Sequence, residues 1–99
     1  DPRHVLGRVV DALVADGLTP VVAVELEFFL LEMRDGKPDI ARGLASGEAP
    51  ATNEVYSLRE MADFKPFFDD LYAACDAQDL PLESAISEYA PGQFELTLR

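Results

Sequence analysis

The sequence is poor in cysteine, histidine and basic residues. Among 99 residues there is one cysteine, Cys75, and one histidine, His4. A lone cysteine has no disulfide partner within the chain, and its place in a helical pattern predicts a reduced core residue rather than a catalytic thiol. Eight basic residues against nineteen acidic ones give a formal net charge of −11 at pH 7. This charge repels phosphate backbones, which argues against nucleic-acid binding and favours cations as partners.

Long hydrophobic segments are also missing. No apolar stretch reaches the roughly 20 residues needed to span a bilayer, and the start lacks the basic and apolar regions of a signal peptide. We therefore expect a soluble, cytoplasmic protein without membrane contacts. A chain of this size supports one core. The start on Asp1-Pro2 without methionine, and the end on Arg99 directly after a strand-like segment, predict that residues 1–99 are part of a longer protein.

The first third of the chain is predicted to form a helix and a strand. Apolar residues recur at three- and four-residue spacing over residues 2 to 16, and Asp1 can cap this helix. The segment VVAVELEFFLLEMR, residues 21–34, is rich in β-branched and aromatic residues and ends at the turn signal Asp35-Gly36. It predicts one long, mostly buried strand.

The remainder is predicted to be a long loop, then helix, strand and strand. Residues 37 to 56 show no sustained period and indicate a loop. One or two helices should follow, because Ser57 begins a capping-box pattern and Asp63 can cap again, with the helical pattern ending near Gln78. The segments LESAISEYA and QFELTL are short enough for strands. The expected fold class is α+β, an antiparallel sheet with helices packed on one face.

Four glutamates lie within or beside the strand-like segments. Glu25 and Glu27 belong to the apolar run VVAVELEFFLL, and Glu88 and Glu95 flank the turn in SEYAPGQFEL. Because residues i and i+2 of a strand point to the same face, Glu25 and Glu27 should project side by side. One face of this strand is therefore expected to be acidic.

The turn between the last two strands suggests how the second pair of glutamates is arranged. A two-residue turn at Pro91-Gly92 gives three cross-strand pairs: Ala90 with Gln93, Tyr89 with Phe94, and Glu88 with Glu95. This register is a hypothesis, because Pro-Gly is not the favoured hairpin turn and a longer loop would shift it. Like charges placed opposite each other destabilise a sheet, and a divalent cation would remove the conflict. Carboxylate oxygens suit Mg²⁺, Mn²⁺ or Ca²⁺, whereas zinc is expected to recruit histidine or cysteine.

A simpler interpretation is that each glutamate lies on a solvent-exposed face of the sheet, as a single glutamate in a strand usually does. Two glutamate pairs within such apolar segments favour the metal-binding hypothesis over this one. A plain structural domain that binds no metal is the corresponding alternative for the whole chain.

These segments resemble a known family. VELEFFLL is similar to the G-x-E-x-E-F-F-L segment of glutamine synthetases, and SEYAPGQFEL resembles their E-x-x-x-G-Q-x-E segment. The resemblance covers nearly the whole chain and implies a single partial domain, residues 1–99, from the N-terminal portion of a glutamine synthetase-like catalytic domain. The seven-residue offset from Glu88 to Glu95, with Phe94 before the second acid, looks more like the γ-glutamyl-polyamine synthetase branch.

The resemblance implies an ATP-dependent ligase. Glutamate's γ-carboxylate would attack the γ-phosphate of ATP, and ammonia or an amine would displace the phosphate from the γ-glutamyl phosphate intermediate. Mg²⁺ or Mn²⁺ ions would hold the phosphates and glutamate. Glu27, Glu88 and Glu95 match ligands of the ion nearest glutamate, and Glu25 matches a ligand of the ion nearest the nucleotide phosphates.

Two further residues match positions near the nucleotide in this family: Glu83 and, more loosely, Tyr56. For Tyr56, a loop aromatic that packs near the helix start is an equal alternative. The family's remaining ligands, its arginines and the domain that completes the site from a neighbouring subunit have no match here. The resemblance thus implies a homo-oligomeric enzyme with active sites between subunits, of which residues 1–99 alone are inactive. The alternative is a non-catalytic metal-binding or regulatory relative of the same fold.

Overall fold

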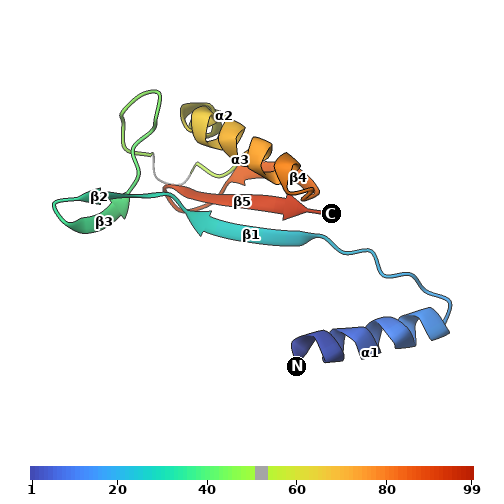
Figure 1. Ribbon diagram of the computed structural model, residues 1–99. Coiled ribbons are helices and arrows are strands. Elements are labelled where there is room, and N and C mark those ends of the chain that lie inside the picture. The colour runs from blue at the N-terminus through green and yellow to red at the C-terminus, as the bar shows by residue number, and fades with distance from the viewer. Residues whose placement is uncertain (51–53) are drawn as a thin grey trace.

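The structure is a small antiparallel sheet with two helices on one face, preceded by a helix that lies apart (Figure 1). The computed structural model describes residues 1–50 and 54–99. Its elements are α1 (Pro2–Ala15), β1 (Val24–Phe29), β2 (Leu31–Arg34), β3 (Lys37–Ile40), α2 (Leu58–Asp63), α3 (Lys65–Ala77), β4 (Leu82–Ser87) and β5 (Gln93–Leu98). The three-stranded sheet has the order β1-β5-β4, and β2 and β3 form a separate hairpin. The predicted α+β class is confirmed.

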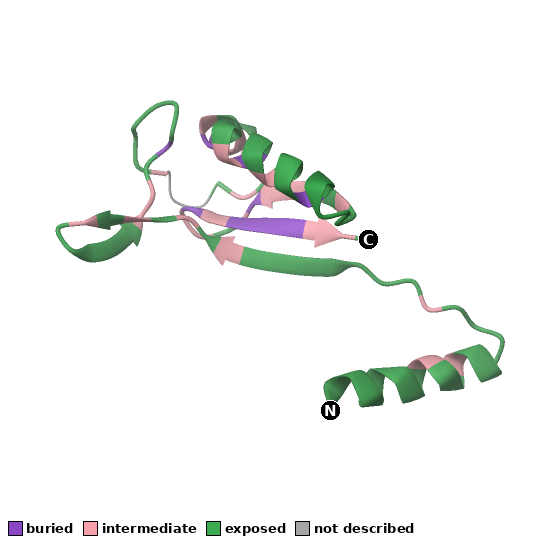
Figure 2. Cartoon of the chain, in the orientation of Figure 1, coloured by how far each residue is buried: buried purple, intermediate pink, exposed green. Residues whose placement is uncertain are grey.

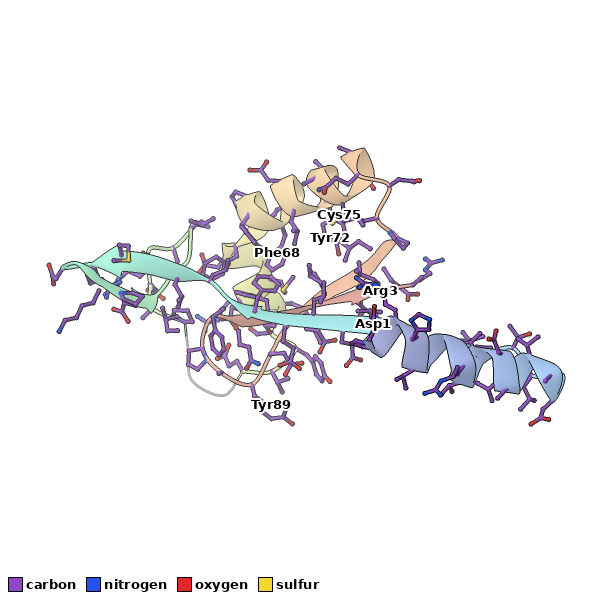
Figure 3. The ribbon with its side chains drawn as sticks, turned by 60° about the horizontal axis from the view of Figure 1, so that its bottom comes forward. Asp1, Arg3, Phe68, Tyr72, Cys75 and Tyr89 are labelled. Atoms are coloured by element: carbon purple, nitrogen blue, oxygen red, sulfur yellow. The ribbon has the colours of Figure 1, made fainter. Side chains whose placement is uncertain are left out.

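The hydrophobic core lies between the central strand β5 and the helices α2 and α3 (Figure 2). Alternate residues of β5, Phe94 and Leu96, point toward the helices and are buried. The Phe94 ring meets those of Phe64 and Phe68 edge-on, with centroids 5.3 and 5.1 Å apart, a favoured geometry for aromatic pairs. Cys75 is buried on α3, as predicted, and Figure 3 shows it on the same helix as Phe68 and Tyr72.

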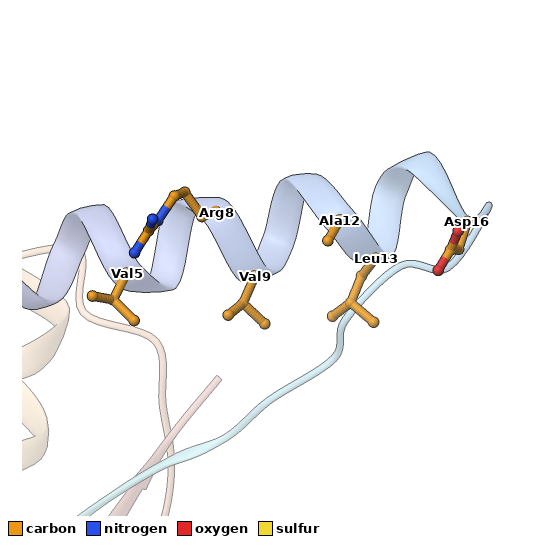
Figure 4. A pocket seen from close by; sticks show the side chains of 6 residues that line it. All are labelled: Val5, Arg8, Val9, Ala12, Leu13 and Asp16. Carbon is orange, nitrogen blue, oxygen red and sulfur yellow. The ribbon is translucent and has the colours of Figure 1, made fainter.

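The first helix forms as predicted but packs against little else. The Asp1 carboxylate accepts the Arg3 backbone N–H at 2.9 Å and caps it. Val5, Val9 and Leu13 point to one side of α1 (Figure 4), yet no residue of this fully described helix is buried. Across the described ranges, no helix combines the length and apolar character needed to cross a membrane.

The prediction of one long, mostly buried strand over residues 21–34 is wrong. The chain leaves the three-stranded sheet at Leu30, whose N–H donates to the Gly92 carbonyl and whose carbonyl accepts the Ala41 N–H, both at 3.0 Å. Beyond it, β2 pairs with β3 instead of extending β1. Among the strands that the structure describes, β1 is bonded only to β5 and is an edge strand, and all its residues except Phe28 are exposed.

The predicted loop over residues 37–56 contains strand β3. The turn signal before it is confirmed, because Asp35 and Gly36 both adopt left-handed backbone conformations, with φ of 50° and 76°. Such a pair of residues matches the twist of a two-residue hairpin. Pro38 lies within β3 opposite Met33, where a residue without an N–H is tolerated because the hairpin has only two strands.

Asp63 does not cap α3, contrary to the prediction. Phe64 takes the N-cap position without a side-chain hydrogen bond. The Asp63 carboxylate instead accepts the backbone N–H and the hydroxyl of Ser46, at 2.7 and 2.6 Å. A Cβ at Gly43 would lie only 1.8 Å from this carboxylate. The carboxylate therefore organises the turn over residues 43–48 rather than the helix end.

Replacing Gly92 by alanine is expected to destabilise the fold more than the same change at Gly36. Both glycines have positive φ, 70° and 76°, a conformation that costs an alanine roughly 1–2 kcal/mol. At Gly92 the new Cβ would also lie 2.6 Å from Ile40 Cγ2, whereas at Gly36 it would meet open space. Urea unfolding of the two variants measures the difference. Equal losses would show that the contact with Ile40 adds nothing.

Candidate functional site

Strand alternation places the predicted glutamates on the sheet surface opposite the helices. Within the pairing of β1 and β5, Glu25 lies opposite Thr97 and Glu27 opposite Glu95. Opposed residues of a pair share a face, so the predicted common orientation of Glu25 and Glu27 is confirmed. We call this surface the acidic face; its four glutamates are Glu25, Glu27, Glu88 and Glu95.

The predicted register of the last two strands is wrong by two residues. Ile86, not Glu88, lies opposite Glu95, and the Glu88 N–H donates to the Gln93 carbonyl at 2.8 Å. The connection spans residues 88–92 rather than Pro91-Gly92 alone. Because side chains alternate with a period of two, a shift of two residues leaves Glu88 on the acidic face. The glutamate directly opposite Glu95 is therefore Glu27.

Glu95 is the most enclosed carboxylate of the acidic face, with a relative exposure of 9%. Burial is the largest cause that raises its pKa above the ordinary value, and the negative charges of Glu25, Glu88 and Glu27 raise it further. The four glutamates thus repel one another through space, and Glu95 is held in a position that disfavours its charged form. A bound cation would reverse this effect.

Three carboxylates of the acidic face each have one oxygen held by a neutral donor. Glu27 Oε2 accepts Gln93 Nε2–H at 2.8 Å, Glu88 Oε2 accepts the Tyr89 N–H at 3.2 Å, and Glu95 Oε1 accepts the Thr97 hydroxyl at 3.4 Å. Over residues 1–50 and 54–99, however, no three acidic, histidine or cysteine side chains converge closely enough to hold a metal ion. The donor chemistry fits a hard divalent cation, although the four carboxylates do not converge on one point.

The two predicted nucleotide-binding residues lie at opposite ends of β4. The Tyr56 N–H donates to the Ser87 carbonyl at 3.0 Å, and its side chain is 67% exposed. Glu83 is at a bulge near the start of β4, where it forms an ion pair with Arg99 at 3.5 Å. Ser87 lies four residues along β4 from Glu83, a distance of about 13 Å. The structure therefore does not bring these two residues together.

Glu60 is a buried carboxylate that the sequence did not single out. The Ser57 hydroxyl accepts the Glu60 N–H at 3.2 Å, as the capping box predicts. The Glu60 side chain does not bond back to the Ser57 N–H, which instead donates to Ser87 Oγ at 2.7 Å. It reaches across the core side to accept the Gly92 N–H at 3.2 Å, and burial raises its pKa. No local pattern indicates this contact, because its partners are 32 residues apart.

Gln93 is the other residue that the sequence reading missed. It shares the acidic face with Glu95, and its amide contacts Glu27. Period-two alternation from Glu95 would have placed it on this face, but its partner depends on the pairing of β1 with β5.

The chain thus forms an antiparallel sheet with helices on one face and glutamates on the other. Comparison with known proteins shows which family has this sequence. All residues 1–99 match the catalytic domain of glutamine synthetase, and the chain belongs to this family. Among curated proteins it is similar to gamma-glutamylputrescine synthetase PuuA of Escherichia coli (strain K12), with 38% identity over 101 residues. That alignment covers 99% of this chain and 21% of the relative, so the chain spans about a fifth of the relative's length. No solved structure matches the chain.

The predicted family is thereby confirmed, and the similarity to a γ-glutamylputrescine synthetase supports the predicted branch.

Proposed function

We propose that this chain supplies carboxylate ligands for Mg²⁺ or Mn²⁺ in an ATP-dependent glutamate–amine ligase. The observation that carries this proposal is the enclosure of Glu95 on a face with three further glutamates, whose charges raise its pKa. An acidic surface of this kind is costly without a counter-charge, and a divalent cation supplies one. In this proposal residues 1–99 are the N-terminal portion of the catalytic domain of a longer protein.

The proposed ligand sets follow the family match and the strand positions. Glu27, Glu88 and Glu95 hold one ion nearest glutamate, and Glu25 holds a second nearest the ATP phosphates. When bound, such ions neutralise the charge that develops during phosphoryl transfer. The opposition of Glu27 and Glu95 across β1 and β5 supports their assignment to one ion. Glu83 and Tyr56 remain proposed neighbours of the nucleotide.

The proposed nucleophile is an amine, most simply a polyamine. The relative with 38% identity is named for putrescine, a diamine, and the net charge of −11 favours a cationic substrate over a neutral or anionic one. The intermediate would be a γ-glutamyl phosphate. The longer protein is proposed to be a homo-oligomer whose active sites lie between subunits, because residues 1–99 provide only part of the required groups.

Divalent cations are expected to raise the melting temperature of the protein. A ligand that binds only the native state stabilises it by about 2.7 kcal/mol at a concentration one hundred times the dissociation constant. Thermal melts at increasing Mn²⁺, together with calorimetric titration, measure the effect. Glu88→Gln should weaken binding, whereas Glu48→Gln should not, because Glu48 belongs to the exposed turn over residues 43–48.

Two results would count against this proposal. A melting temperature that does not change with millimolar Mg²⁺ or Mn²⁺ would exclude an ion site on the acidic face. Equal affinities of wild type and Glu88→Gln would remove Glu88 from the ligand set. Tight metal binding without ligase activity in the longer protein would instead favour a non-catalytic relative.

A further inference from the structure

The side-chain amide of Gln93 bridges the β4–β5 connection and the edge strand β1. Its oxygen Oε1 accepts the Ala90 backbone N–H at 3.2 Å, and its nitrogen Nε2 donates to Glu27 Oε2 at 2.8 Å. The two contacts fix the orientation of the amide, because only the oxygen can accept from Ala90 and only the nitrogen can donate to a carboxylate. Gln93 therefore presents an N–H group to one oxygen of Glu27.

We propose that Gln93 is a positioning residue that holds Glu27 ready to bind the divalent cation. The inference rests on the proposed function, since it assigns a role toward the same ion. Gln93 occupies one oxygen of Glu27 and leaves the other to face the cation. Hydrogen bonds of this kind to metal-binding carboxylates orient them and raise metal affinity.

Glu27 needs such a restraint because of its place in the sheet. It lies on the exposed edge strand β1, directly opposite the enclosed carboxylate of Glu95. Repulsion between the two charges favours conformations of Glu27 that swing away into solvent. Gln93 lies diagonally across from Glu27, since it pairs with Phe29, and diagonal neighbours are within reach of long side chains.

The backbone of Gln93 is itself fixed from the core side. Its neighbour Gly92 donates its N–H to the buried carboxylate of Glu60 at 3.2 Å and accepts the Leu30 N–H at 3.0 Å. Its other neighbour, Phe94, is fully buried in the core. The amide thus extends from a backbone position with little freedom, so its hydrogen bond holds the Glu27 carboxylate in a defined position.

Replacing Gln93 by leucine tests this role, because leucine keeps the approximate size and removes both hydrogen bonds. We expect the Mn²⁺ dissociation constant to rise roughly 10-fold, within the range for loss of an outer hydrogen-bond partner. The melting temperature of the metal-free protein should change little. Gln78→Leu is the matched control. Gln78 is an exposed glutamine whose amide donates from Nε2 to the Ala74 carbonyl at 2.9 Å, but it lies at the end of α3.

A second measurement, in the metal-free protein, does not depend on ion binding. The side-chain amide resonances of Gln93 should shift toward those of a free amide when Glu27 is replaced by alanine, while those of Gln78 stay unchanged. If the chemical shifts of the Gln93 side-chain amide stay unchanged on this substitution, the inference is overturned even if the protein binds Mn²⁺.

The outcomes separate this inference from the proposed function. Wild-type binding of Mn²⁺ with an unchanged dissociation constant in Gln93→Leu overturns the positioning role and leaves the proposed function standing. A loss of metal-free stability in Gln93→Leu that accounts for the weaker binding also overturns it, because the role is then structural. Absence of Mn²⁺ binding in the wild type overturns the proposed function, and the positioning role with it.

Discussion

Phe94→Ala is expected to cost about 3–5 kcal/mol of unfolding free energy, as aromatic-to-alanine changes in cores do. The Phe94 side chain is fully buried, and its ring contacts those of Phe28, Phe64 and Phe68 at centroid distances of 6.1, 5.3 and 5.1 Å. It therefore joins the two helices to the sheet. Because small domains have a net stability of roughly 5–15 kcal/mol, the loss should remove a large fraction of the total stability.

The same change should also weaken metal binding. Phe94 lies between Gln93 and Glu95, so the residues on either side of it in β5 belong to the acidic face. Urea unfolding followed by circular dichroism, and Mn²⁺ titration of the same sample, measure both losses. Phe29→Ala is the matched control, because the Phe29 side chain is already 48% exposed. Equal costs for the two variants would contradict the central position of Phe94 in the core.

Features set by neighbouring residues were predictable from the sequence. The cap at Asp1, the hairpin turn at Asp35-Gly36 and the start of α2 at Ser57 each depend on contacts within a few residues. The helical pattern around Cys75 likewise predicted the burial of this residue. In all of these, local chemistry and the final fold favour the same conformation.

Features that depend on contacts between distant residues were not predictable from the sequence. The run from residue 21 to 34 has uniform strand character, and only the hydrogen bonds of Leu30 to Gly92 and Ala41 divide it between two sheets. Asp63 had a good local position for a helix cap, but Ser46 on a remote turn supplies two donors to its carboxylate. Competing tertiary contacts therefore decided these outcomes.

The glutamates that share the acidic face were predicted correctly despite a wrong register. The length of the β4–β5 connection depends on Glu60 and Ile40, which meet Gly92 from distant segments, so the sequence placed Glu88 opposite the wrong residue. The resulting shift was an even number of residues, and each side chain kept its face. The membership of the face was thus predictable from strand parity, whereas the hydrogen bond of Gln93 to Glu27 required the structure.

Glu95→Gln is expected to change stability in opposite directions without and with metal. Burial and the charges of Glu25, Glu88 and Glu27 raise the pKa of Glu95, so its charged form destabilises the metal-free native state. An uncharged glutamine removes that cost, and the metal-free variant should melt higher than wild type at pH 7. With Mn²⁺ the variant should melt lower, because it has lost a proposed ligand. Its affinity should fall by more than the roughly 10- to 100-fold that loss of an outer-shell partner costs.

The pH dependence of the same pair of proteins provides an independent check. A carboxyl whose pKa is raised in the native state binds its proton more tightly there than in the unfolded chain. Its stabilising contribution is therefore fully present below the ordinary value of 4.5 and is lost as pH rises through the raised native value. Wild type and Glu95→Gln should have similar metal-free melting temperatures near pH 4.5 and diverge toward pH 7.

Glu60, whose pKa is also raised by burial, acts alike in both proteins, so the divergence between them reports on Glu95. Glu48→Gln, on the exposed turn over residues 43–48, should follow the wild-type curve. A metal-free Glu95→Gln protein that melts below wild type at pH 7 would show that the Glu95 carboxylate stabilises the sheet through a contact of its own. In that case the acidic face would not require a cation, and the argument for metal binding from charge repulsion would fail.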